Sequence, residues 1–328
     1  MPALNKYSLI GFGLQTVEAS TEAVPTLPTF TWLPLAGSLG FKKELNPEVL
    51  DMADRNHFDH LAFSKGQWWA GSIPIYLCSG AVTNLIDWIQ TRDTNNQGKF
   101  ANIWITQGVT GNATEEATGI WRRAVDVKVN SAEFAFTAGD PVRVNLNCTG
   151  KGDGITTNAP TGHATVLSAI QGNPFLWKEA TLSIAATEAA DVAVDYTIKD
   201  LTVTIDNAVQ DPSDGLRFNG SYNPYRLYNT GGVKVSGSFT RDMSDTALYD
   251  AYHNQYTAAA WYSSAYNIKL QIVIAAVGLT GLTLSMPSVR ITEYEAQPSG
   301  ERRSLITESV SFEAFGSADG ATAPITLS

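Results

Sequence analysis

The sequence has few charged residues and few cysteines. Asp, Glu, Lys and Arg make up 16% of its 328 residues, against roughly a quarter in an ordinary soluble domain, while 44% are hydrophobic. A chain with little charge and much Ser, Thr, Asn and Gly often hides its surface in permanent contacts, so we expect an assembly subunit. Cys78 and Cys148 are too few for a disulfide framework, and we expect both thiols to be reduced.

Clustered basic residues and long apolar runs are also missing. The net charge is −10, and the longest basic clusters are the pairs Arg122-Arg123 and Arg302-Arg303, which disfavours gripping of nucleic acid through its phosphates. The opening residues, MPALNKYSLIGFG, lack the pattern of a signal peptide, and the longest apolar stretch, 272–279, is too short to span a bilayer. We therefore expect a protein made and used in a cytoplasm, without a membrane.

Strand patterns dominate the chain. Segments that alternate in polarity or are rich in β-branched and aromatic residues are separated by Gly, Asn, Asp and Pro, which favour turns. These segments are 67–77, 100–107, 121–129, 141–148, 178–185, 199–206, 233–240, 266–275, 287–295 and 307–315. The sequence therefore predicts a mainly β protein.

Two segments have helical periodicity instead. Residues 81–92 place Leu85 and Ile89 on one face, and residues 244–255 do the same with Leu248 and Tyr252. Ser244 is the expected N-cap of the second helix, because its hydroxyl can accept from a free backbone N–H group.

The two halves of the chain repeat one pattern. Each predicted helix follows a strand with a central glycine, and these glycines, Gly71 and Gly237, are 166 residues apart. The last strand of each half aligns at the same spacing, with Val144 at Val310, and the helices align at a spacing of 163. This agreement predicts a tandem duplication, although all-β segments can also resemble one another by chance.

The repeat predicts the domain organisation. Residues 1–28 form an N-terminal arm, 29–150 a first module, 151–173 a connector, and 174–328 a second module with a C-terminal tail. A long polar stretch precedes each glycine strand, at 46–66 and at 208–230, and loops of this length are usually functional.

Two groups of residues in these stretches are candidates for a site. The segment DMADRNHFDH (51–60) is rich in possible metal ligands, but its spacing fits neither zinc nor calcium motifs, so we interpret it as a solvated or interface loop. Tyr222, Tyr225 and Tyr228 recur every third residue. They could stack on a sugar or anchor a protein interface, where Tyr is enriched, and we favour the interface.

Catalytic patterns are not found in the sequence. It has no G-x-S-x-G elbow and no phosphate-binding glycine motif, and nothing sets two carboxylates at a defined separation. We therefore predict no catalytic, cofactor-binding or metal-binding residues, and a protein that is not an enzyme.

Several segments resemble the tail tube (major tail) proteins of long-tailed phages. They are KEATLSIA (178–185) followed by KDLTVTIDNAVQ (199–210), the closing ESVSFEAFGSADGATAPITLS (308–328), and the glycine-bearing strand with its following helix in both halves. The resemblance implies a structural virion protein built from two small tail-tube-like β-sandwich or barrel modules, each with one short α-helix and long loops. The usual subunit of this family has one such module, whereas this chain has two.

The resemblance also implies a mode of assembly. Tail tube subunits generally form stacked hexameric rings lined by a β-barrel, so two modules per chain imply homotrimeric rings with pseudo-six-fold symmetry. Four strands per module would give about 24 strands, and with about 4.8 Å between strands and a tilt near 40° the backbone diameter is roughly 45–50 Å. DNA could pass through such a lumen during ejection without specific binding. Expected partners are further copies of the chain and other tail proteins (tape measure, terminator and tip), in a virion tail assembled in the host cytoplasm.

Strand alternation assigns residues to faces. Those expected to face the core are Val144, Leu146, Cys148, Val235, Phe239, Val310, Phe312 and Ala314. Those expected to face the lumen are Arg143, Asn145, Asn147, Lys234, Ser236, Ser238, Ser309, Ser311 and Glu313. The candidates for ring stacking are Asp54, His57, Phe58, His60, Phe218, Tyr222, Tyr225 and Tyr228, with the arm and the C-terminal tail reaching neighbours.

Three other functions remain open at this stage. The tyrosine stretch would also suit a carbohydrate-binding or adhesin module. Another tail component, such as a terminator or baseplate protein, would form a single ring. A β-rich hydrolase would need a carboxylate or metal site that the sequence does not display.

Overall fold

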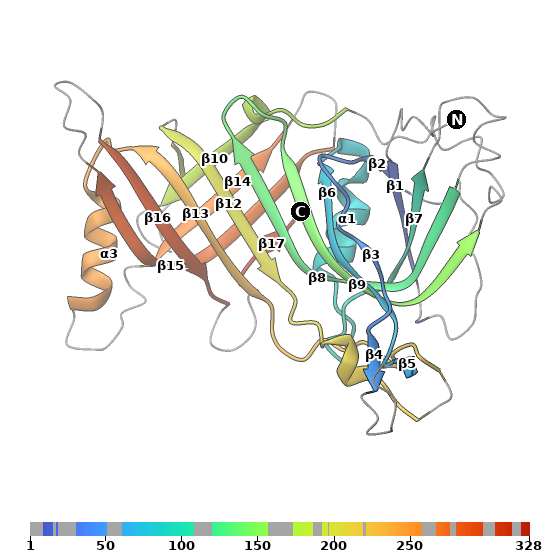
Figure 1. Cartoon of the computed structure of the whole chain (residues 1–328). Coiled ribbons are helices and arrows are strands. Elements are labelled where there is room, and N and C mark those ends of the chain that lie inside the picture. The colour runs from blue at the N-terminus through green and yellow to red at the C-terminus, as the bar shows by residue number, and fades with distance from the viewer. Residues whose placement is uncertain are drawn as a thin grey trace.

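The computed structural model describes residues 9–15, 18, 31–50, 61–107, 120–156, 173–185, 192–195, 197–218, 221–257, 267–275, 280–297, 306–316 and 323–328. Within these residues the protein is mainly β, as predicted. Fifteen strands form one antiparallel sheet and two form a separate hairpin (Figure 1). None of the described helices is long and apolar enough to cross a membrane.

Each of the ten predicted strand segments contains a strand. The N-terminal half of the sheet consists of β1 (Leu9–Leu14), β2 (Thr31–Pro34), β3 (Lys42–Glu44), β6 (Trp68–Tyr76), β7 (Ala101–Gln107), β8 (Ile120–Thr137) and β9 (Arg143–Thr156). The C-terminal half consists of β10 (Ala180–Ala185), β11 (Ala193–Val194), β12 (Ile198–Asp206), β13 (Lys234–Asp242), β14 (Ile268–Ile274), β15 (Leu282–Gln297), β16 (Thr307–Ala314) and β17 (Thr326–Leu327). The separate hairpin is β4 (Pro47–Leu50) with β5 (Leu61–Ser64).

The strands of the two halves pair in the same order. The order is β2–β1–β7–β8–β9–β6–β3 in the N-terminal half and β11–β10–β14–β15–β16–β13–β12 in the C-terminal half. Irregularities in the ladders also correspond, because the β8–β9 register shifts after Val129 and the β15–β16 register shifts after Ile291. The halves are joined by pairing of β8 with β12.

The strand registers refine the predicted spacing between the halves. Gly71 of β6 lies opposite Cys148 of β9, whereas Gly237 of β13 lies opposite Phe312 of β16, 164 residues after Cys148. The glycine strands therefore match at 166 and the last strands at 164, so the predicted match of Val144 with Val310 is two residues out. Residues two apart point to the same face of a strand, so the predicted core and polar faces are unchanged.

The central glycines of β6 and β13 allow close packing of the backbone. Gly71 has a φ of +129°, and a Cβ there would lie 2.2 Å from the carbonyl oxygen of Gly40. A Cβ at Gly237 would lie 2.3 Å from the carbonyl oxygen of Thr202 and 2.4 Å from the Phe312 ring. Any larger side chain at either position would push a neighbouring strand or ring aside.

One helix packs inside each half. Helix α1 (Val82–Gln90) lies between β1 and β8, because the Trp88 ring stacks on Phe12 at 5.1 Å and its Nε1–H donates to the Val127 carbonyl at 3.1 Å. Helix α3 (Ala247–Thr257) packs on β15, where Tyr252 stacks on Tyr294 at 6.2 Å. Both helices thus cover core residues of the strand that follows the helix and its next neighbour along the chain.

The start of α3 differs from the prediction. The Asp245 side chain, not that of Ser244, accepts a hydrogen bond from the backbone N–H group of Ala247 at 3.0 Å. A carboxylate at this position also suits the positive end of the helix dipole.

The structure also changes three predicted boundaries. Strand β1 lies within the predicted arm 1–28 and pairs with β2 and β7. Strand β9 continues six residues into the predicted connector, to Thr156. The last residues pair with β15 as β17, and the Gln90 side chain donates to the Ile325 carbonyl and accepts from the Leu327 N–H group. The C-terminal tail therefore folds back onto its own chain.

Candidate functional site: the polar face of the sheet

One face of the sheet is polar without interruption across both halves. Along one row of directly opposed residues, Asn145 of β9 faces Glu133 of β8, which faces Thr204 of β12. Thr204 in turn faces Ser236 of β13, and Ser236 faces Glu313 of β16. The row crosses the junction between the halves, so five neighbouring strands present one surface.

A second row runs parallel to the first. It consists of Arg143, Ala135, Thr202, Ser238 and Ser311, each opposite the next. The hydroxyls of Thr202 and Ser238 lie 3.0 Å apart and hydrogen-bond across β12 and β13. We call the residues of the two rows, together with Asn147, Lys234 and Ser309 on the same strands, the polar face.

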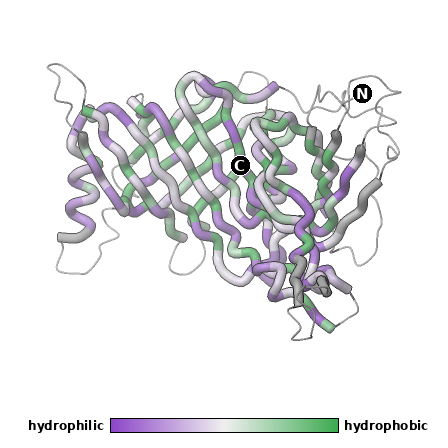
Figure 2. The backbone as a smooth tube through the Cα atoms, viewed as in Figure 1, coloured by the Kyte–Doolittle hydropathy of each residue, from purple (hydrophilic) through white to green (hydrophobic). Residues whose placement is uncertain are grey.

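The opposite face of these strands is the hydrophobic core. All eight residues predicted to face the core are buried except Gly237's neighbours on the polar side, and their exposed fractions are 7% or less. The nine predicted lumen residues are exposed or half-buried and lie on the other face. Figure 2 shows the resulting alternation of hydrophobic and hydrophilic residues along the strands. The predicted division into two faces is therefore confirmed, while the identity of the polar face as a lumen remains a prediction.

Sequence reasoning missed the middle of the polar face. Glu133 and Ala135 of β8, and Thr202 and Thr204 of β12, lie between the residues predicted from the two halves. Their alternation with buried residues, as in KDLTVTID, carried the signal. What the sequence did not provide was the pairing of β8 with β12, which brings these residues together.

Arginines at the polar face lie next to carboxylates. The Arg143 guanidinium is 3.4 Å from the Asp140 carboxylate, and the Arg290 guanidinium, on β15 opposite Glu313, is 2.7 Å from the Glu313 carboxylate. Because these cations already have anionic neighbours, the polar face offers a polyanion few strong attachment points.

The two predicted ring-stacking stretches meet at one end of the sheet. The first contains the β4–β5 hairpin, and the second contains the short 3₁₀ helix Pro212–Gly215 (Figure 1). The backbone N–H group of Gln67 donates to the carbonyl of Tyr222 at 2.9 Å, so the second stretch touches the base of the first. Of the candidates, Asp54, His57, Phe58 and His60 lie outside the described residues.

The aromatic candidates of the second stretch are exposed. Tyr222 and Tyr225 are 60% and 51% exposed, Tyr228 is 40% exposed, and Phe218 is fully exposed. The Arg226 guanidinium lies 5.3 Å from the Tyr225 ring centre and its Nη1–H group donates to the Tyr228 hydroxyl at 3.0 Å. The stretch therefore presents several large rings to solvent beside an arginine.

The sequence matches a family model described as phage tail tube protein over residues 13–314, from β1 to the end of β16. The chain belongs to the phage tail tube protein family. This confirms the resemblance noted in the sequence. A tail tube protein is a structural component of the virion tail, so this is a structural protein of a phage tail.

Solved structures of phage tails are similar to this tail tube protein. One is the SPP1 tail tube, determined by solid-state NMR and cryo EM, with 15% identity over 44% of this chain and 77% of that chain and a TM-score of 0.33. Another is the tail of an empty GTA particle with C6 symmetry, with 10% identity over 46% of this chain and 96% of that chain and a TM-score of 0.31. No curated protein sequence matches significantly.

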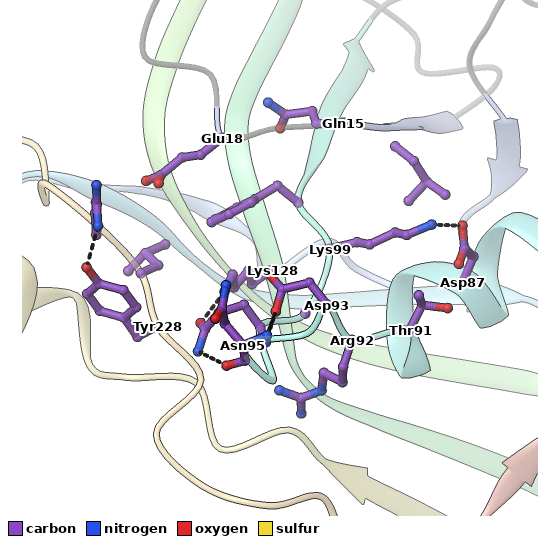
Figure 3. Close-up of a pocket in the computed structure, with 16 residues that line it drawn as sticks. Gln15, Glu18, Asp87, Thr91, Arg92, Asp93, Asn95, Lys99, Lys128 and Tyr228 are labelled. Carbon is purple, nitrogen blue, oxygen red and sulfur yellow. Dashed lines mark hydrogen bonds and ion pairs between the residues drawn. The ribbon is translucent and has the colours of Figure 1, made fainter.

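A cavity of about 880 Å³ lies beside α1 in this tail tube protein, lined also by the loop after α1 and by residues 226–228 (Figure 3). Lys128 of β8 reaches it but is only 1% exposed. Its ammonium group donates to the side-chain oxygens of Asn229 and Gln97, at 2.9 and 3.2 Å, and lies 4.5 Å from the Phe100 ring centre. Burial, with the nearby Arg92, lowers the pKa of Lys128 to about 8.

The same cluster ties the two halves together. The Arg92 guanidinium donates to the backbone and side-chain oxygens of Asn207, which directly follows β12. The Asn207 amide donates to the carbonyls of Ile89 and Val129, at the end of α1 and on β8. The polar groups at this cavity therefore hold the junction of β8 and β12, which is a structural role.

We expect Lys128→Met to change how stability depends on pH. The folded-state pKa of Lys128 lies below its unfolded value, so the wild type gains stability as pH rises from about 8 towards 10.5 and the variant does not. Relative to the variant, the wild type should gain about 2–3 kcal/mol between pH 7 and about pH 10. Both amide oxygens keep a donor, the N–H groups of Gly98 and Asn229, so the variant should fold. Denaturant unfolding at several pH values measures the difference.

The matched control is Lys178→Met, at an exposed lysine. Its stability should run parallel to that of the wild type over the same pH range. A difference between wild type and Lys128→Met that stays constant with pH would show that Lys128 keeps its ordinary pKa in the folded protein.

Proposed function

We propose that this chain is a tandem fusion of two tail tube modules, that three chains close into a ring, and that stacked rings form the hollow tail tube. The observation that carries the proposal is the continuous polar face, which spans two halves with the same strand order. In each chain the strands of this face and its edges follow the order β3–β6–β9–β8–β12–β13–β16–β15, four from each half. Three chains would therefore supply about 24 strands, as expected for a lumen of roughly 45–50 Å across the backbone.

The polar face would line this lumen. Its side chains are mostly Ser, Thr and Asn, and its arginines lie beside carboxylates, so DNA could slide past without lasting phosphate contacts. The hydrophobic core lies on the other face, where α1 and α3 cover it. This arrangement places the helices on the outside of the tube wall.

Stacking of rings would use the end of the sheet where the β4–β5 hairpin meets the tyrosine stretch. Exposed aromatic rings next to an arginine are typical of protein interfaces. The same surfaces at the two ends of the tube would contact the terminator and the tip, and the tape measure would occupy the lumen before DNA does. We place assembly in the host cytoplasm and assign the chain no catalytic activity.

Electron microscopy of the purified, concentrated protein tests the proposal, with the mass per ring as the second readout. We expect long tubes whose repeat contains three chains of 35.3 kDa. Tubes with six chains per ring would contradict the use of both halves as equivalent modules. Single rings that never stack would indicate a terminator-like component instead, and monomers under every condition would contradict assembly by this chain alone.

A further inference from the structure

The junction between the two halves provides a template for contact between chains. On one side of the junction, β8 contributes the edge from Ser131 to Thr137, and on the other side β12 contributes the edge from Asp200 to Asp206. In the common strand order, β15 holds the place of β8, and β3 holds the place of β12. The edges that correspond to the junction are therefore β15 at one end of the chain and β3 at the other.

Neither edge is paired with a strand in the described part of the chain. The pairing of β14 with β15 ends at Val289, so beyond that point β15 has a strand neighbour on one side only, β16. Strand β3 pairs with β6 and with no other described strand. Figure 1 shows the two strands at opposite sides of the molecule. Open edges of this kind tend to pair with another chain.

We propose that neighbouring chains in the ring pair β15 of one chain with β3 of the next, antiparallel, in the register of the β8–β12 junction. The proposal rests on the proposed ring and adds the contact that closes it. Each chain would use a different edge for each neighbour, which is the geometry that generates closed rings.

The registers define which residues meet. The shifts after Val129 and after Ile291 place β8 and β15 162 residues apart in sequence. The β3–β6 and β12–β13 ladders give the same spacing between Lys42 and Thr204, because their partners Ala70 and Ser236 are 166 apart like the central glycines.

The in-chain pair Glu133–Thr204 then predicts that Glu295 of one chain lies opposite Lys42 of the next. The carboxylate and the ammonium group have opposite charge, as favours direct cross-strand neighbours. The same register puts Glu44 opposite Glu293, and Lys42 is 3.9 Å from Glu44 in its own chain. One ammonium group would therefore lie among carboxylates of both chains.

A second feature of the free edge supports the pairing. Asn207, which follows β12 at the junction, is only 3% exposed and bonds to the end of α1. Leu45, at the corresponding place after β3, is 54% exposed. In the proposed contact Leu45 would meet the end of the next chain's α3, where the 46% exposed ring of Tyr249 lies. An exposed leucine and an exposed aromatic ring would thus be covered together.

Disulfide trapping in assembled tubes tests the register. Directly opposite residues of antiparallel strands have Cβ atoms about 4.5–5.5 Å apart, close to disulfide geometry, and the native Cys78 and Cys148 are buried. In the double variant Lys42→Cys with Glu295→Cys, mild oxidation should give covalent dimers and trimers on a non-reducing gel. The control, Lys42→Cys with Ala296→Cys, places the second thiol on the other face of β15 and should give neither.

The possible outcomes separate this proposal from the proposed function. Tubes in which the Lys42–Glu295 pair gives no cross-links, or in which the Ala296 control cross-links equally, would overturn the edge assignment and leave the tube intact. If the cysteine variant does not assemble, charge reversal decides. Lys42→Glu should raise the protein concentration needed for assembly several-fold, and adding Glu295→Lys should restore it. Failure of that rescue would overturn the assignment, whereas failure of the wild type to form rings would contradict the proposed function itself.

Discussion

Arg241→Met is expected to lower the free energy of unfolding by about 3–5 kcal/mol at neutral pH, because it leaves a carboxylate buried without its cation. Arg241 is 4% exposed and Glu308 is 0% exposed. The Arg241 Nε–H group donates to the Glu308 carboxylate, and Nη1 donates to Asp195 at 2.6 Å. Tyr294 also donates to Glu308, at 2.6 Å. The cluster links β13, β16 and β15, so its loss should be felt throughout the C-terminal half.

Charge, rather than lost packing, should account for most of this effect. The pKa of Asp195 is lowered in the wild type, because hydrogen bonds from Thr197 and Arg241 outweigh the opposing effect of burial. This contribution is present at neutral pH and is lost as pH falls through the folded-state pKa of Asp195. In the variant, Glu308 can be protonated in acid, so the difference from the wild type should narrow towards about pH 4.

Urea unfolding of the wild type and the variant measures the loss, and two further variants test its cause. Adding Glu308→Gln to Arg241→Met removes the stranded charge and should recover part of the stability. Lys199→Met breaks the half-exposed ion pair with Asp242 and should cost less than about 1 kcal/mol. If Arg241→Met cost no more than Lys199→Met, the cluster would not be a significant source of stability.

Replacing Phe218, Tyr222 and Tyr225 together by serine is expected to leave rings intact and to abolish long tubes. These side chains are at least 51% exposed in the single chain, so the fold does not depend on burying them. The contact between the two long stretches uses the backbone oxygen of Tyr222, which the substitution retains. Loss of three aromatic contacts at every ring interface would be multiplied along the tube, because each ring contributes several copies.

Point substitution is a sharper test than deletion of 214–228, which would also remove the buried Leu227. Tube length in electron micrographs and the sedimentation coefficient give the two readouts. Trp177→Ser is the matched control, since Trp177 is 48% exposed but lies in the short helix Trp177–Glu179, outside the stretch. Tubes of normal length from the triple variant would show that this end of the sheet does not stack rings.

The local pattern of the sequence was sufficient for most strands and both helices. In β13 and β16 every second residue is apolar, so Val235, Phe239, Val310 and Phe312 could be assigned to the core before any partner strand was known. The predicted glycine strands were also correct, and the structure supplies the reason, which is the close approach of Phe312 and a neighbouring backbone to Gly237.

Several features could not be predicted because they depend on distant partners. Strand β1 contains Gly11 and Gly13, which weaken a strand pattern, and becomes a strand through pairing with β2 and β7. Lys128 looks like one more polar residue of an alternating strand until Gln97 and Asn229 enclose it. The cap of α3 was placed one residue early, because Ser244 and Asp245 are both good caps and only the geometry of the turn selects one.

The sequence by itself determined the mainly β composition, the two faces of the strands, the repeated glycine strand with its helix, and the resemblance to phage tail tubes. All of these follow from residues close together in the chain, where the period of two and the spacing of turns operate. The tertiary structure alone decided that β8 pairs with β12, which makes one polar surface of two halves and leaves β3 and β15 as open edges. Strand pairing over such distances depends on backbone hydrogen bonds that every sequence can offer, so the packing of the whole core selects the partner.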